Sequence, residues 1–156
     1  MISMKLYKKT SLLMLYIDFA RAFDSVPITI ILDKLKLIGI SGKIYKLIKN
    51  FLENRTFRVK IDNVLSDNFT TSPSVPQGSV LGPLLFLIFI NDLPKNLPDD
   101  INIKIYADDV KLYISHNNGF NTEILSQALL GVKKWAAING LGIALKKCFS
   151  LHWEEQ

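Results

Sequence analysis

Short apolar runs with strand-like character appear at both ends of the chain. The first is followed directly by Asp18, which we expect at the end of a buried strand. Two later segments alternate apolar and polar residues on either side of Tyr106, Ala107, Asp108 and Asp109, a pattern typical of a hairpin with a tight turn. The predicted strands cover residues 12–17, 101–105, 110–114, 141–145 and 149–153.

Other segments place apolar residues at helical spacing. Pro27 precedes one such segment, and Ser41 is suited to cap the next, which carries lysines on its opposite face. Residues 57–71 alternate and turn back near Asn63, which predicts a second hairpin. The predicted helices cover residues 28–38, 42–52, 84–93 and 121–138.

Strands and helices are mixed here without a regular βαβ order. This favours an α+β fold in which an antiparallel sheet is backed by helices. The 156 residues suit one compact domain, and the apolar runs at 11–17 and 80–90 are shorter than the roughly 20 residues that span a bilayer. We therefore expect buried core segments, neither a signal peptide nor a membrane anchor.

Composition narrows the class of protein. Hydrophobic residues make up 49% of the chain, which argues against disorder. The single cysteine, Cys148, excludes a disulfide-stapled secreted scaffold and favours a reducing compartment.

Charge is unevenly distributed along the chain. Residues 1–60 carry 12 basic and 4 acidic side chains, whereas residues 61–110 carry 2 basic and 7 acidic ones. This split suggests a surface for a polyanion next to a carboxylate site that could hold cations, although solvated basic faces are also common.

Two carboxylate sites are the strongest chemical signal. Asp18 follows one strand, and Asp108 and Asp109 occupy the turn of a hairpin. Oxygen ligands of this kind suit Mg²⁺, and two such ions about 4 Å apart can catalyse phosphoryl transfer. The alternative is structural, because aspartates are common in turns and at helix caps.

Three segments carry a family resemblance. They are LYIDFARAFDSV at 15–26, VPQGSVLGPLLF at 75–86 and YADD at 106–109. In this order and spacing they resemble successive motifs of reverse transcriptases from non-LTR retrotransposons, such as the jockey-like elements of animals. The resemblance covers most of residues 12–153 and implies a polymerase palm with RNA-directed DNA polymerase activity and two Mg²⁺ ions.

The resemblance implies roles for individual residues in catalysis. Asp18 and Asp108 match metal-ligating carboxylates, the backbone carbonyl of Phe19 matches a further metal ligand, and Asp109 supports the metal site. Lys147 matches a lysine proposed to donate a proton to the pyrophosphate. Near it, Ala144 departs from the family, where related elements often carry Asn.

Five more residues match the nucleotide-binding part of the family. Phe23 matches the aromatic gate that excludes a ribose 2′-OH. The amides of Arg21 and Ala22 match triphosphate contacts, and Gln77 and Gly78 match the loop that lies against the incoming nucleotide and the template.

The implied partners are an RNA template, a DNA primer and deoxynucleoside triphosphates, with no membrane and an intracellular, nuclear or cytoplasmic ribonucleoprotein location. Eight basic side chains would help to hold the nucleic acid backbones. They are Lys34, Lys36, Lys43, Lys46, Lys49, Arg55, Arg58 and Lys60.

Residues 1–11 are expected to form a short extension and residues 12–156 a palm-like domain. This length accommodates neither the fingers nor the thumb of the family, so we expect a partial domain whose missing regions a longer protein supplies. The alternative hypothesis is a truncated, non-catalytic relic or nucleic-acid-binding module that retains the palm fold.

Overall fold

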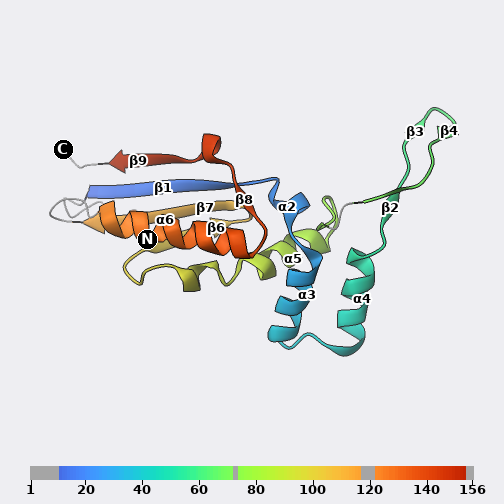
Figure 1. The fold of residues 1–156 in the computed structure, drawn as a ribbon, viewed down its shortest axis with the longest axis horizontal. Helices are drawn as coiled ribbons and strands as arrows, with labels where there is room; N and C mark the ends of the chain where they lie inside the picture. Colours follow the sequence, from blue (N-terminus) through green and yellow to red (C-terminus); the bar gives the residue numbers. More distant parts are fainter. Residues whose placement is uncertain (1–10, 72–73, 117–121, 154–156) are drawn as a thin grey trace. The chain divides into compact units, whose positions relative to one another are not determined.

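The computed structural model describes residues 11–71, 74–116 and 122–153 (Figure 1). The chain divides into two compact units: Met1–Ala20 with Asp92–Gln156, and Arg21–Asn91. The predicted extension at residues 1–11 lies, apart from Ser11, outside the described residues.

The first unit is built on a five-stranded antiparallel sheet. β1 lies at its centre and pairs with β7 on one side and with β8 and β9 on the other, and β6 follows β7. The strands are β1 (Ser11–Ala20), β6 (Asn102–Tyr106), β7 (Asp109–His116), β8 (Gly142–Ile143) and β9 (Phe149–Trp153), and two 3₁₀ turns are η1 (Leu93–Asn96) and η2 (Leu145–Lys147).

Alternation along the strands gives the sheet two different faces. Ile17 and Phe19 of β1 are buried on one face together with Val110 and Leu112 of β7. The long helix α6 (Thr122–Ile138) packs against this face, and the ring of its Trp135 lies 6.0 Å from the ring of Phe19. The opposite face carries the carboxylates and, at its β9 edge, exposed aromatic residues.

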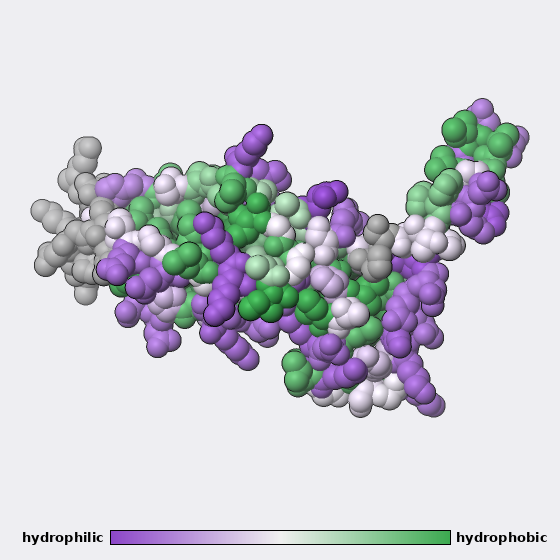
Figure 2. All heavy atoms as spheres, viewed as in Figure 1, coloured by the Kyte–Doolittle hydropathy of each residue, from purple (hydrophilic) through white to green (hydrophobic). Residues whose placement is uncertain are grey.

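The second unit is helical with one extended hairpin. Its elements are α2 (Ala22–Ser25), α3 (Ile28–Leu37), α4 (Gly42–Leu52), the hairpin strands β2 (Thr56–Phe57), β3 (Lys60–Ile61), β4 (Val64–Leu65) and β5 (Phe69–Thr70), and α5 (Leu81–Ile90). Ile31 and Leu35 of α3 are buried, as are Phe86 and Phe89 of α5. Figure 2 shows apolar side chains exposed along the hairpin, whose strands pair β2 with β5 and β3 with β4.

The mixed α+β fold with an antiparallel sheet confirms the prediction, and each predicted helix and hairpin is present. The predicted helix at 84–93 is wrong at both ends, since α5 runs from Leu81 to Ile90 and Leu93 begins η1. α5 is the most apolar of the helices, yet no helix in the described ranges combines the length and apolar character needed to cross a membrane.

Two further predictions, the end of β1 and the cap of α4, differ from the structure. β1 does not end at Asp18 but continues to Ala20, because Phe19 and Ala20 pair with β8. The predicted start of α6 at Asn121 lies outside the described residues. Ser41 stands at the N-cap of α4 but makes no capping hydrogen bond with its side chain.

A glycine in α6 allows close contact with η1, which gives a test of the first unit. A Cβ on Gly131 would meet the backbone carbonyl oxygen of Asn96. We expect Gly131→Ala to lower the free energy of unfolding by about 2 kcal/mol, because this overpacking outweighs the helix propensity gained. Chemical denaturation measures the change. Gly142→Ala is the control, since its Cβ would sit 3.6 Å from the Cβ of Ala20; equal stability of the two variants would contradict the packing argument.

Candidate active site

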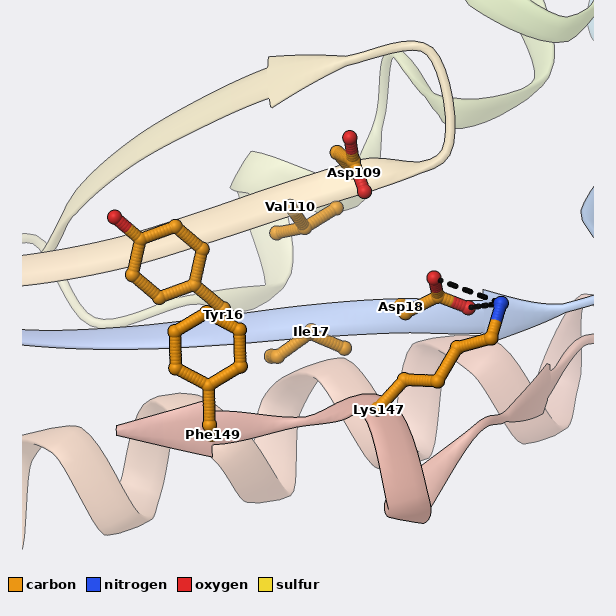
Figure 3. A pocket seen from close by; sticks show the side chains of 7 residues that line it. All are labelled: Tyr16, Ile17, Asp18, Asp109, Val110, Lys147 and Phe149. Atoms are coloured by element: carbon orange, nitrogen blue, oxygen red, sulfur yellow. Dashed lines mark hydrogen bonds and ion pairs between the residues drawn. The ribbon is translucent and has the colours of Figure 1, made fainter. Parts of the chain in front are cut away.

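The register of two strands brings a pair of carboxylates together. Asp18 of β1 lies directly opposite Asp109, the first residue of β7. The amide of Ala144 donates to the backbone carbonyl of Asp18 over 2.9 Å, so the backbone polar groups of Asp18 point away from β7. Asp18 and Asp109 are therefore a non-hydrogen-bonded pair, the kind that brings side chains closest. Figure 3 shows both carboxylates at the same pocket.

The turn that precedes Asp109 is strained. Tyr106 pairs with Asp109, which leaves Ala107 and Asp108 to reverse the chain. Ala107 has a φ of 51°, a left-handed conformation that costs a non-glycine residue about 1–2 kcal/mol. Such strain is characteristic of functional sites. It places a half-buried Asp108 next to Asp109 at the end of the sheet.

Lys147 reaches Asp18 from η2. Its Nζ lies 3.3 Å from each side-chain oxygen of Asp18, and the Lys147 side chain is 69% exposed against 24% for that of Asp18 (Figure 3). The turn is anchored beneath this contact, because the Lys147 amide donates to the Ala144 carbonyl. Sequence comparison indicated Lys147, but pattern alone misses its contact with a residue 129 positions away.

The side chain of Phe19 is buried in the core, whereas its backbone carbonyl lies at the site. The side chain is 1% exposed and belongs to the core. Phe19 pairs with Ile143 of β8. In the same register, the neighbouring Asp18 accepts a hydrogen bond from the amide of Ala144. Because backbone groups alternate sides along a strand, the Phe19 carbonyl points away from β8 and toward the edge where β7 ends. This direction suits the metal-ligand role implied for it.

The carboxylates open on a cavity of about 150 Å³. Besides Asp18, Asp109 and Lys147, its lining includes Tyr16 and Phe149, whose rings stack with centroids 4.4 Å apart. Sequence reasoning missed both aromatic residues as part of the site. The position of Tyr16, two residues before Asp18 on a strand, places it on the same face and is the signal that could have found it.

The donor set fits a hard divalent cation. Asp18, Asp108, Asp109 and the Phe19 carbonyl offer only oxygen ligands, as Mg²⁺ prefers. The ammonium of Lys147, in contact with both oxygens of Asp18, marks a position in front of that carboxylate where a positive charge is stabilised. Within the described ranges, however, no three acidic, histidine or cysteine side chains are already clustered as a metal cage.

The second unit brings together three of the residues predicted to bind the nucleotide. Phe23, Gln77 and Gly78 line a cavity of about 210 Å³ with Pro76 and Pro83. The ring of Phe23 stacks on that of Phe86, with centroids 4.5 Å apart. The Gln77 side-chain amide donates to Asp24 over 2.8 Å, and Gly78 adopts a φ of 75° that favours glycine.

Arg21 and Ala22 begin the same unit. Arg21 is exposed and left-handed, with a φ of 47°, and its carbonyl accepts from the amides of Asp24 and Ser25. Ala22 is buried at the start of α2. The predicted site residues thus form two groups, one in each unit: Asp18, Phe19, Asp108, Asp109 and Lys147 in the first, and Arg21, Ala22, Phe23, Gln77 and Gly78 in the second.

Comparison with known proteins finds similarity over most of the chain. Residues 3–156 match the family model described as "Reverse transcriptase (RNA-dependent DNA polymerase)". The chain is 34% identical over 140 residues to the RNA-directed DNA polymerase from mobile element jockey of Drosophila melanogaster, covering 85% of this chain and 15% of that protein. It is 33% identical over 148 residues to the probable RNA-directed DNA polymerase from transposon BS of the same species, covering 87% and 16%.

Solved structures share the fold. Telomerase from Candida albicans, in complex with a fragment of telomeric RNA, matches with a TM-score of 0.76 and 13% identity over 96% of this chain and 29% of that one. Apo telomerase from Candida tropicalis matches with a TM-score of 0.74 and 16% identity over 94% and 31%. The chain therefore spans a small part of each protein it resembles.

The register at the carboxylate pair can be tested without any activity. In a Cys148→Ser background, the double variant Asp18→Cys with Asp109→Cys should form a disulfide on mild oxidation, because non-hydrogen-bonded partners have suitable Cα spacing. Loss of free thiols, with mass spectrometry of the linked peptides, measures the bond. Asp18→Cys with Val110→Cys is the matched control, since Val110 lies on the opposite face; cross-linking there instead would show a shifted register.

Proposed function

Since the chain belongs to the reverse transcriptase (RNA-dependent DNA polymerase) family, we propose that it carries the nucleotidyl-transfer site of an RNA-directed DNA polymerase from a non-LTR retrotransposon. In this reaction a primer 3′-oxygen bonds to the α-phosphorus of a deoxynucleoside triphosphate, the bond from that phosphorus to the bridging oxygen breaks, and pyrophosphate leaves. The observation that carries the proposal is the direct pairing of Asp18 with Asp109 beside Asp108.

The carboxylate pair and its neighbours supply the cation site of the proposal. Asp18, Asp108, Asp109 and the carbonyl of Phe19 would hold two Mg²⁺ ions. When bound, such ions favour ionisation of the attacking hydroxyl and offset negative charge on the leaving group. The protein's own contribution is the position of these groups: the β1–β7 register holds the carboxylates of Asp18 and Asp109 on one face, and the strained turn keeps Asp108 next to them in the chain.

The second unit supplies the nucleotide contacts of the proposal. The Phe23 ring would lie against the sugar and would leave no room for a 2′-hydroxyl. Its stacking on Phe86 restricts its movement, which supports this role. Gln77 and Gly78 would meet the base and the template, and the hydrogen bond from Gln77 to Asp24 holds their loop in place. The amides of Arg21 and Ala22 would meet the triphosphate.

The basic residues of this unit are proposed to contact the template and primer backbones. Some of them already make contacts within the protein, whereas others are exposed. Lys34 donates to the Phe89 carbonyl and Arg55 to Ser74, so both support the fold. Lys43 and Lys46 are exposed on α4, where Figure 2 shows hydrophilic residues gathered. These two lysines are the better candidates for salt-sensitive phosphate contacts.

Lys36 also has partners within the protein. A hydrogen bond with Tyr45, and then one with Asp33, raises the pKa of Lys36 above its ordinary value. It therefore stays charged, but its ammonium is directed to these neighbours.

Primer extension tests the proposed activity. On a poly(A) template with an oligo(dT) primer and Mg²⁺, Asp108→Ala should lower incorporation by the chain about 100-fold or more, because a charged group aligned with the reacting centre is lost. Asp67→Ala, which replaces an exposed aspartate between β4 and β5 of the hairpin, is the control and should keep full incorporation. Equal incorporation by the unsubstituted chain and Asp108→Ala, or none by either, would contradict catalysis by this chain alone and favour the nucleic-acid-binding alternative.

Sugar selectivity tests the role of Phe23. Phe23→Val should raise the ratio of ribonucleotide to deoxyribonucleotide incorporation by about tenfold, since a shorter side chain opens space for a 2′-hydroxyl. Competition between labelled nucleotides measures the ratio. Phe69→Val, on the exposed hairpin, should leave it unchanged. Unaltered selectivity in an active Phe23→Val chain would rule out the gate.

A further inference from the structure

The carboxylate of Asp18 is already paired with a cationic side chain of the protein itself, that of Lys147. The Nζ atom of Lys147 contacts both of its side-chain oxygens at 3.3 Å, so the ammonium lies symmetrically in front of the carboxylate. The rest of this pocket supplies a second acidic group, Asp109, directly across the strands. The positive charge of Lys147 therefore reduces the repulsion between the carboxylates of Asp18 and Asp109, which face each other across the strands.

A divalent ion on Asp18 and the ammonium of Lys147 compete for the same oxygens. A Mg²⁺–oxygen distance of about 2.1 Å would bring the two positive charges into close repulsion if both stayed. One of them must therefore leave when the other binds.

The ion pair between Lys147 and Asp18 can break without disturbing the surrounding backbone. Its side chain is 69% exposed, and exposed ion pairs contribute little to stability. The backbone of η2 is held separately, since Ala144 donates to the Asp18 carbonyl and accepts from the Lys147 amide. The four-carbon stem can therefore swing away from the carboxylate while the turn keeps its place on β1.

We propose that Lys147 is a built-in counterion of Asp18, which it releases when a divalent cation binds. The inference rests on the proposed metal role of Asp18. By linkage, the counterion must weaken cation binding by the same factor by which the cation weakens the ion pair. It also means that the ammonium becomes available at the mouth of the pocket only after the cation has bound.

Titration of the full chain with Mn²⁺, followed by electron paramagnetic resonance of the free ion, tests the coupling without any turnover. Lys147→Gln should bind Mn²⁺ about fivefold more tightly than the unsubstituted chain, the affinity equivalent of an exposed ion pair. Lys147→Arg keeps the charge and should stay near the unsubstituted affinity. Because the side chain is exposed, neither substitution disturbs the core.

Two controls separate the counterion from other causes. Lys111 lies two residues from Asp109, but its Nζ is placed 4.9 Å from the centroid of the Tyr16 ring. Lys111→Gln therefore removes a nearby charge without freeing Asp18 and should change Mn²⁺ affinity by less than twofold, whereas Asp18→Asn should abolish the binding.

The outcomes are distinguishable. Equal affinity of Lys147→Gln and the unsubstituted chain, with binding lost in Asp18→Asn, would overturn the counterion and leave the metal site standing. An equal gain from Lys111→Gln would overturn it as well, because general electrostatics would then suffice. Undiminished Mn²⁺ binding by Asp18→Asn would instead refute the metal role of Asp18 and, with it, the proposed function.

Discussion

The register of β1 against β7 is the constraint on which the first unit depends. One strand must bury Ile17 and Phe19 against α6 and at the same time present Asp18 on the opposite face. Because side chains alternate, a slip of one residue would bury the carboxylate and expose the core. The hydrophobic effect that fixes the fold therefore also fixes the pairing of Asp18 with Asp109, and the site needs no separate device to hold that pair.

The turn at Ala107 and Asp108 carries backbone strain that this arrangement requires. A two-residue connection is needed to begin β7 at Asp109, and it forces Ala107 into a left-handed conformation that glycine would adopt without strain. The long β1–β7 ladder and the buried Val110 and Leu112 hold the turn in this conformation. A rigid sheet thus supplies the stability that a strained, polar turn lacks.

Sequence patterns predicted the fold class and most elements, because burial imposes a period that can be seen in the residues themselves. They failed where tertiary contacts decide. β1 continues past Asp18 because β8 pairs with it, and α5 ends at Ile90, where the polar Asn91 and Asp92 follow and Leu93 begins η1. For the site, motif resemblance named Asp18, Asp109 and Lys147, but only the fold shows that Lys147 touches Asp18 and that Tyr16 and Phe149 stack beside them. Contacts between residues so distant in sequence leave no local pattern.

The ion pair between Lys147 and Asp18 also connects two roles that sequence comparison kept apart. In the proposed function, Asp18 must be free to bind a metal ion, and Lys147 must be positively charged and near the phosphates to donate a proton to the pyrophosphate. The contact between the two side chains would serve both needs in turn, because the carboxylate holds the ammonium at the pocket and, in the proposed exchange, would release it when a divalent cation binds. A lysine with a buried stem could not move away in this way. The exposure of Lys147, which makes the pair weak, is what favours the proposed exchange.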